Sequence, residues 1–227
     1  MSRLIISEKS DAAARIAVIL SQGTSKRTSV NKVSVFQFEG ESGTTFIIGL
    51  RGHIIELDYP ESLNNWSEVE LSDLIYAEPI KNVSAHSIVN ALKDLSIDAD
   101  EIVIATDYDR EGELIGMEAV RLLDTEGKEI KRARFSAFTK LEIDTAFNDL
   151  TDPDIKLADS AECRQKIDLA WGAVLTRFIS MSSGQGGSNF LSVGRVQSPT
   201  LALIVARHKE IEEFVPQPYW NINARFE

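Results

Sequence analysis

The sequence predicts an α/β fold: a mainly parallel sheet in a first domain, followed by the helical start of a second domain. Short apolar runs suited to buried strands alternate with segments rich in helix formers, and this alternation is typical of βα units. Beyond Thr151 the alternation stops and one long helical run follows. At about 150 residues per domain, a length of 227 residues fits one large domain or two small ones.

The first domain is expected to span residues 1–150. Its predicted strands are short and rich in β-branched or aromatic residues: Leu4–Ile6, Val33–Phe38, Thr44–Leu50, Ile102–Ala105 and Ile130–Phe135. A hairpin turn is expected at Gly40–Gly43. The predicted helices are Ala12–Leu20 with Ser10 or Asp11 as cap, Ser84–Leu95 and Gly112–Leu123.

The second domain is expected to span residues 151–227. It starts at the breaker Thr151–Asp154, which is followed by a helical run to Met181 and a glycine-rich loop at Ser183–Ser188. A last helix should begin with Ser198 as cap and Pro199 in its first turn, where a missing N–H costs nothing.

Residues Trp220–Phe226 alternate between apolar and polar side chains, which predicts a half-buried strand. No turn or partner strand follows it. We therefore expect the chain to be the N-terminal part of a larger protein.

The composition limits the possible functions. The charge balance of 24 basic and 35 acidic residues gives −11, which argues against a general nucleic-acid binder. However, the stretch Lys128–Lys140 holds five basic residues and one acidic residue, and a local patch of this kind can bind phosphate. A solvated strand edge is the alternative.

The single Cys163 excludes a disulfide framework, and no apolar run reaches the ~20 residues of a membrane span, so we expect a cytoplasmic protein without a membrane partner.

An acidic segment follows the predicted strand Ile102–Ala105. Asp107, Asp109 and Glu111 occupy alternate positions, so they point the same way if the segment is extended. Carboxyl ends of parallel strands are where open α/β sheets place their ligands. Glu8 lies just past the strand Leu4–Ile6 and joins the same cluster if the two strands are neighbours.

Such a cluster is expected to hold a cation, because four close carboxylates repel one another. Oxygen ligands without histidine or cysteine favour Mg2+, which takes one or two carboxylates and keeps several waters. The alternative is an acidic turn that is exposed to solvent and holds no cation. An aspartyl-nucleophile phosphatase also places Asp-x-Asp after a strand. That class usually has threonine where this chain has Glu111, and its strand lies near the N-terminus.

Several motifs resemble one known family. Ile5–Lys9 and Ala105–Glu113 look like the Toprim domain, a Rossmann-like domain shared by type IA topoisomerases, primases and some nucleases. Arg51–His53, Arg164–Asp168 and Leu191–Leu201 are similar to type IA DNA topoisomerases in particular. The resemblance covers essentially the whole chain, and the Gly-Arg-Val-Gln-Ser-Pro-Thr run within it is highly specific. The pair Glu8–Lys9 and the run Ile167–Gly172 look closest to archaeal and topoisomerase III-like members.

The resemblance implies a Mg2+-dependent enzyme that cuts one DNA strand through a 5′-phosphotyrosyl link, passes another strand and reseals it, relaxing negatively supercoiled DNA. It implies that Asp107 and Asp109 hold the Mg2+ and that Glu8 shares the metal or protonates the leaving 3′ oxygen. Glu111 would support the site, and Lys9 would lie near the scissile phosphate.

The resemblance also implies contacts to single-stranded DNA. They come from His53, Arg164, Asp168 and the six residues Ser192, Val193, Gly194, Arg195, Val196 and Gln197. The alternatives are a surface ion pair between Arg164 and Asp168, a structural role for His53 and an ordinary loop at 192–197.

The family's nucleophilic tyrosine has no match here. Tyr59, Tyr76, Tyr108 and Tyr219 all lack its sequence context. We therefore predict that this chain alone does not cleave DNA. A Toprim nuclease or primase and a non-catalytic single-strand-binding module remain the alternatives.

Overall fold

Six strands form the central sheet, in the order β2-β3-β4-β1-β7-β8. A computed structural model describes residues 2–40 and 43–226. β4, β1, β7 and β8 run parallel, whereas β2 and β3 form an antiparallel extension. The predicted parallel α/β sheet is confirmed. The strands are β1 (Arg3–Ser7), β2 (Lys26–Val30), β3 (Val33–Gly40), β4 (Gly43–Gly49), β7 (Glu101–Ala105) and β8 (Glu129–Arg132).

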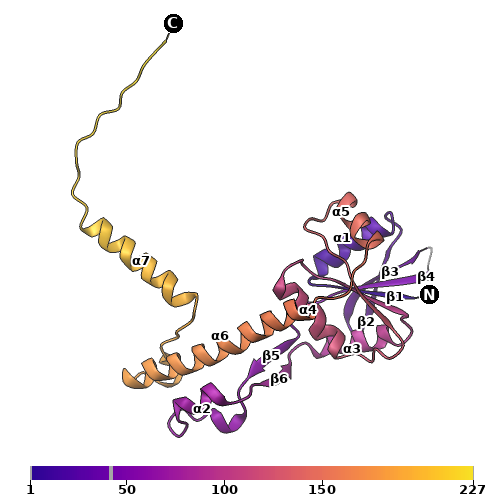
Figure 1. Ribbon diagram of the computed structural model, residues 1–227, viewed down its shortest axis with the longest axis horizontal. Helices are drawn as coiled ribbons and strands as arrows, with labels where there is room; N and C mark the ends of the chain where they lie inside the picture. Colours follow the sequence, from indigo (N-terminus) through magenta and orange to yellow (C-terminus); the bar gives the residue numbers. More distant parts are fainter. Residues whose placement is uncertain (1, 41–42, 227) are drawn as a thin grey trace. The chain divides into compact units, whose positions relative to one another are not determined.

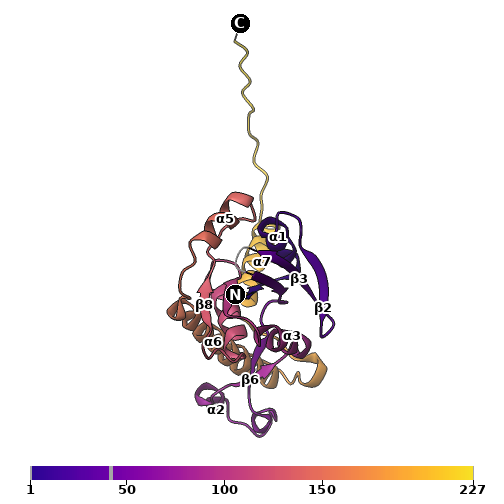
Figure 2. The ribbon, with the colours of Figure 1, turned by 90° about the vertical axis from the view of Figure 1, so that its right-hand side faces the viewer.

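Helices cover both faces of this sheet (Figure 1), and a view turned by 90° shows the same layers (Figure 2). α1 (Ser10–Leu20) and α5 (Lys140–Asn148) lie on one face, and α3 (His86–Ser96) and α4 (Arg110–Arg121) lie on the other. Residues of β1 alternate between the two sides: Ile5 packs with α1 and α5, whereas Leu4 and Ile6 pack with α3 and α4. All three are fully buried, which is why a parallel strand reads as a continuous apolar run.

Some elements were absent from the sequence prediction. β2 is polar and exposed at the sheet edge, so it has no apolar alternation to predict it. The small antiparallel sheet of β5 (Ile55–Asp58) and β6 (Ile80–Val83) was missed as well, because each of its strands has only four residues. α5 does carry a signal: the Thr139 hydroxyl accepts a hydrogen bond from the Glu142 N–H, as in a capping box. The predicted hairpin turn includes residues 41 and 42, which lie outside the described residues.

The chain divides into two compact units. One unit holds the central sheet and comprises the residues up to Asn65 together with Ala77–Leu169. The other comprises Trp66–Tyr76 and the residues from Ala170 onward. The long helix α6 (Ile155–Ser182) begins in the first unit and ends in the second, and it agrees with the predicted helical run.

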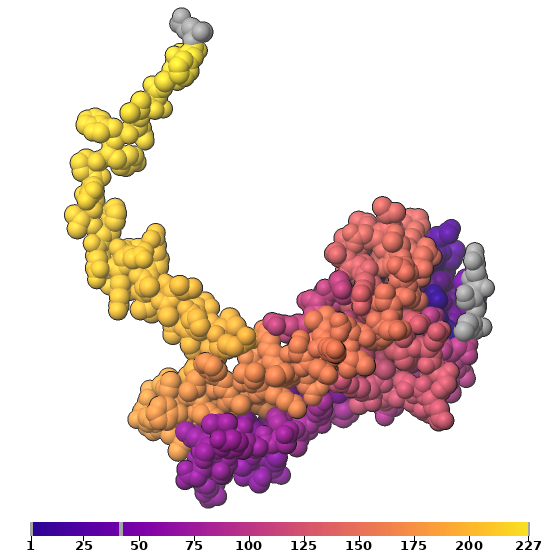
Figure 3. All heavy atoms as spheres, in the orientation of Figure 1, coloured from indigo at the N-terminus to yellow at the C-terminus, as the bar shows by residue number. Residues whose placement is uncertain are grey.

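In the second unit, the segment Trp66–Tyr76 lies beside the end of α6 (Figure 3) and contains α2 (Leu71–Tyr76). The Trp66 ring packs edge-on against Phe190 at 6.0 Å, and the Arg177 guanidinium lies 5.5 Å from its centre. These contacts give the unit a small aromatic cluster.

Two predictions for the second unit were wrong. α7 (Gln197–Glu212) begins one residue before Ser198, and its N-cap is Val196, which supplies no side-chain hydrogen bond. Ser198 and Pro199 therefore lie inside the first turn. The predicted strand Trp220–Phe226 does not form: in the described part of the chain these residues have no strand partner, and Trp220 is 92% exposed. A period of two cannot make a strand where no neighbouring strand offers hydrogen bonds.

No helix among the described residues is both long enough and apolar enough to span a membrane.

Candidate functional site

The carboxyl ends of β1, β4 and β7 lie side by side, and the candidate site is built there. β1 pairs with β7 in parallel register, Ser7 opposite Ala105, and with β4, Ser7 opposite Gly49. The expectation that the Glu8 strand neighbours the Asp107 strand is thus confirmed. Glu8 and Asp107 leave the sheet from the same edge because parallel strands end on the same side.

The backbone around Glu8 is held on both sides. The Gly52 N–H donates to the Glu8 carbonyl at 3.2 Å, and the Ala13 N–H donates to the Lys9 carbonyl at 3.0 Å. Lys9, rather than Ser10 or Asp11, is therefore the N-cap of α1, and no side chain caps this helix. The Glu8 side chain is mostly buried, and its carboxylate lies 3.5 Å from the exposed Lys9 ammonium.

α1 can start this close to the sheet because Gly49 has no side chain. A Cβ at this position would lie 2.5 Å from the Ser10 Cα and 2.6 Å from the Lys9 carbonyl carbon. These atoms belong to backbone, so they could not move aside cheaply. Gly49 thereby sets the position from which the Glu8–Lys9 pair leaves β1.

The acidic segment after β7 is part loop and part helix. Asp107 and Asp109 are exposed, and the Asp109 carboxylate accepts a hydrogen bond from the Gly112 N–H at 2.7 Å. Asp109 is thus the N-cap of α4, which begins at Arg110. The prediction that Glu111 belongs to an extended loop was wrong, because this cap starts the helix two residues earlier than expected.

A buried arginine holds the backbone of this loop from inside the protein. Arg132 is fully buried, and its guanidinium donates to the carbonyls of Thr106 at 2.9 Å and Asp107 at 2.8 Å. It also pairs with the buried Glu113 at 2.7 Å. The second Glu113 oxygen accepts the Asp154 N–H at 2.7 Å, just before α6. Sequence reasoning missed both residues, since Arg132 was counted only within a basic stretch.

His53 joins β4 to α4 and α6. Its Nδ1 lies 3.2 Å from the Glu118 carboxylate, and its Nε2 lies 3.7 Å from Glu111. The Gln165 amide lies 3.3 Å from the ring. The pKa of His53 is raised, first by the hydrogen bond to Glu118 and further by the charges of Glu118, Glu111 and Glu8, against the opposing effect of burial. Glu118 had no sequence signal beyond its place on a helix, whereas Gln165 lies within the Arg164–Asp168 motif but was not singled out.

Glu111 also binds an arginine of α6. The Arg164 guanidinium donates to it at 2.6 Å, whereas the distance from Arg164 to Asp168 is 3.7 Å. The Arg164–Asp168 pair, which was the alternative to a DNA contact, is present, yet the closer partner of Arg164 is Glu111. Arg164 and His53 thus lie next to Glu111 in the first unit, and Asp168 lies next to Arg164.

The loop Ser192–Gln197 belongs to the second unit. The Val193 N–H donates to the Thr176 hydroxyl at 3.0 Å, and the Ser192 hydroxyl donates to the Gln197 side chain at 3.1 Å. The Ser198 N–H donates to the Gly194 carbonyl at 3.0 Å. Arg195 and Val196 are exposed, so the loop presents side chains while α6 anchors its backbone.

Comparison with known proteins decides the family. A family model for the Toprim domain matches residues 3–138, and a DNA topoisomerase model matches residues 152–227. DNA topoisomerase 1 of Thermoplasma acidophilum is 47% identical over 99% of this chain, and DNA topoisomerase 1 of Archaeoglobus fulgidus is 48% identical over all of it. The chain belongs to the type IA DNA topoisomerase family.

The chain spans 29% and 34% of these two topoisomerases. A solved structure of full-length topoisomerase I from Thermotoga maritima gives a TM-score of 0.63 at 29% identity, covering 94% of this chain and 31% of that one. The fold of the chain is thus that of a topoisomerase I segment.

The Toprim domain of this topoisomerase family is a metal-binding domain. In the described ranges 2–40 and 43–226, no three side chains of the His, Cys, Asp and Glu type lie close enough to form a ready metal cage. Such a cage is not required, because Mg2+ typically takes one or two carboxylates and fills the rest of its shell with water and phosphate. The exposed Asp107 and the nearby Glu8 fit that donor set. The metal ligands themselves stay a prediction.

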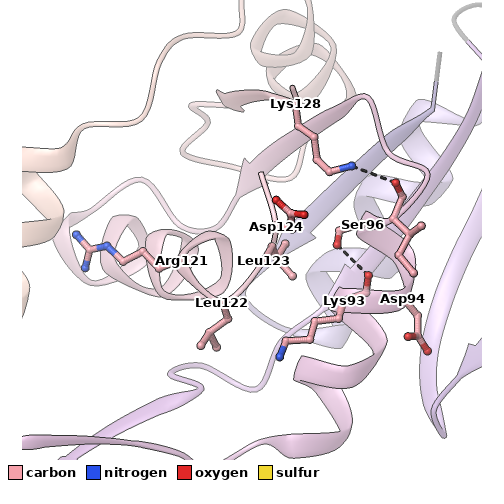
Figure 4. A pocket seen from close by; sticks show the side chains of 9 residues that line it. Lys93, Asp94, Ser96, Arg121, Leu122, Leu123, Asp124 and Lys128 are labelled. Atoms are coloured by element: carbon pink, nitrogen blue, oxygen red, sulfur yellow. Dashed lines mark hydrogen bonds between the residues drawn. The ribbon is translucent and has the colours of Figure 1, made fainter. Parts of the chain in front are cut away.

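A hollow of about 620 Å3 in the first unit has no part in this site (Figure 4). It is lined by the ends of α3 and α4, including Lys93 and Leu122. Those helix ends lead into β7 and β8, so the hollow lies at the amino ends of the strands. The Arg121 side chain points away from the other lining residues in the figure and pairs with Glu162 at 3.0 Å.

We expect the substitution His53→Gln to destabilise the chain more at about pH 6 than at about pH 9. A raised histidine pKa contributes stability that is complete below the unfolded value of about 6.5 and is lost as the pH rises through the folded pKa. Thermal unfolding of both proteins at the two pH values measures this. An equal difference at both would show that the Glu118 contact does not depend on the charge of His53.

Proposed function

We propose that this chain is the part of a type IA DNA topoisomerase that holds a Mg2+ ion and grips a single DNA strand, in an enzyme that relaxes negatively supercoiled DNA. The observation that carries the proposal is the parallel pairing of β1 and β7, which brings Glu8 and Asp107 to the same carboxyl end of the sheet. Residues 1–150 are assigned to the Toprim domain and residues 151–227 to the start of the single-strand-binding domain. The matched ranges 3–138 and 152–227 support this division. DNA as substrate would place the protein in the cytoplasm, at the nucleoid.

The chemistry follows from the positions of the side chains. Asp107, Asp109 and Glu8 would hold the Mg2+, which supplies charge neutralisation at a phosphate. Glu8 lies 3.5 Å from the exposed Lys9 ammonium; it would share the metal or protonate the leaving 3′ oxygen, while Lys9 would offset negative charge on the phosphate.

The remaining residues orient the strand. Arg164 donates to Glu111 at 2.6 Å and His53 lies 3.7 Å from it, so we assign Glu111 to holding these two side chains in place. His53, Arg164 and Asp168 would then contact the single DNA strand. The exposed loop 192–197, with Arg195, would supply further contacts from the second domain.

Two assays test this function. Fluorescence anisotropy with a labelled oligothymidylate of about 12 nucleotides should show binding that weakens with the double substitution Asp107→Asn and Asp109→Asn in the presence of Mg2+. Incubation with negatively supercoiled plasmid and Mg2+ should leave the plasmid intact, because no tyrosine of this chain has the context of the nucleophile.

The outcomes separate the alternatives. Nicking of the plasmid by a clean preparation would favour a Toprim nuclease. Oligonucleotide binding that depends neither on Mg2+ nor on the two aspartates would favour a non-catalytic binding module.

A further inference from the structure

Within the described residues, the basic stretch Lys128–Lys140 contains one cation that neither pairs with a carboxylate nor donates to a backbone carbonyl. The other four basic side chains have partners: the Lys128 ammonium donates to the Ala99 carbonyl, Lys131 pairs with Asp152, Arg132 with Glu113 and Lys140 with Asp144. Arg134 is exposed, and no carboxylate within residues 2–40 and 43–226 pairs with it. In a chain with a net charge of −11, an exposed guanidinium without a carboxylate is available for an external anion.

Arg134 lies against an aromatic ring in the acidic loop. Its guanidinium carbon is 5.3 Å from the centre of the Tyr108 ring. Tyr108 stands between Asp107 and Asp109, and it is 49% exposed. The ring and the guanidinium therefore form one surface feature directly beside the candidate metal ligands.

The ring is supported from inside the protein. The buried Arg132 lies 5.9 Å from the Tyr108 ring centre and also holds the carbonyls of Thr106 and Asp107. The loop backbone under Tyr108 is thus fixed, and burial of the ring does not account for its presence there. An aromatic side chain that the fold positions but leaves half exposed is suited to stacking on a flat ligand.

The pair matches the two parts of a nucleotide. A base can stack on an aromatic face without regard to its identity, and a guanidinium binds phosphate through two parallel hydrogen bonds. Because a phosphate must also reach the neighbouring aspartates in the proposed function, a strand at the metal would bring its next nucleotide to this loop. We propose that Tyr108 and Arg134 form a nucleotide subsite for the DNA strand, in which the Tyr108 ring stacks on one base and Arg134 binds the adjoining phosphate.

This subsite rests on the proposed function, and its test uses the same oligothymidylate with the whole chain. Tyr108→Leu should weaken binding about tenfold or more, whereas Tyr108→Phe should stay within about twofold of the parent because it keeps the aromatic face. Arg134→Gln should weaken binding and lower the slope of log affinity against log salt by about one. Tyr76→Leu serves as a matched control, since Tyr76 is 85% exposed and lies outside the site.

Four results would overturn the subsite. If Tyr108→Leu bound the oligothymidylate as tightly as the parent chain while Arg164→Gln bound it more weakly, the subsite would be rejected and the proposed function would stand. Equal losses for the leucine and phenylalanine variants would exclude stacking. Loss of Mn2+ binding in Tyr108→Leu would assign the ring to loop structure instead. Absence of any binding by the parent chain would contradict the subsite and the proposed function together.

Discussion

Replacing Arg132 by methionine is expected to lower the free energy of unfolding by about 3–5 kcal/mol. The substitution leaves the Glu113 carboxylate buried at 1% exposure without its cation, and it removes the donors for the carbonyls of Thr106 and Asp107. An uncompensated buried charge is costly because the protein interior solvates it poorly. Urea denaturation of the parent and the variant measures the difference.

The chain offers a matched control at the other end of the sheet. Arg3 pairs with Glu101 at the amino ends of β1 and β7, but its side chain is 30% exposed. Arg3→Met should therefore cost no more than about 1 kcal/mol. The double substitution Arg132→Met with Glu113→Leu should recover part of the lost free energy of unfolding, because it removes the buried carboxylate that has no cation. If Arg132→Met cost no more than Arg3→Met, the buried pair would not anchor the loop.

Gly112→Ala is the second large expected effect. A Cβ at this position would lie 2.1 Å from the Asp107 carbonyl oxygen, which is backbone and already held by Arg132. The loop or the start of α4 must shift, so we expect destabilisation of about 1–3 kcal/mol or more, together with weaker metal binding. Thermal unfolding and Mn2+ titration of one preparation give both readings.

Gly172 provides the comparison for this substitution. It also lies in a helix, and its nearest neighbour to a new Cβ would be the Val193 carbonyl at 3.9 Å, which is ordinary contact. Gly172→Ala should therefore be neutral or stabilising by up to about 1 kcal/mol. Equal effects at the two glycines would mean that the tight approach of Gly112 to Asp107 is not needed.

The sequence predicts the buried half of this fold well. The runs around Ile5, Ile47 and Val103 are apolar because both faces of a parallel sheet are covered, so they are recognisable without neighbours. Because these strands run parallel, Glu8 and Asp107 lie at the same carboxyl end of the sheet. β2 was not predictable in this way, because an exposed edge strand takes its conformation from its partner rather than from its own pattern. β5 does alternate, but over only four residues.

The supports of the candidate site were harder to predict than its exposed acids. Arg132 and Glu113 are 19 positions apart in the chain, and nothing in their local sequence marks them as buried. Likewise, the closer partner of Arg164 is Glu111, 53 positions away, although the local pattern pairs it with Asp168. Contacts between distant side chains depend on how helices pack on the sheet, which the local sequence does not state.

The central claim is that Glu8 from β1 and the Asp107–Asp109 pair after β7 hold the same divalent ion. Mn2+ binding to the whole chain, followed by its paramagnetic signal, tests this most directly. Removing a partner outside the first ligand shell typically costs 10- to 100-fold in affinity, so Glu8→Gln and the double aspartate substitution should each cost at least about tenfold. Asp124→Asn, at the opposite end of the sheet, should leave the affinity unchanged. An affinity that Glu8→Gln does not alter, while the aspartate substitutions abolish binding, would contradict a shared site.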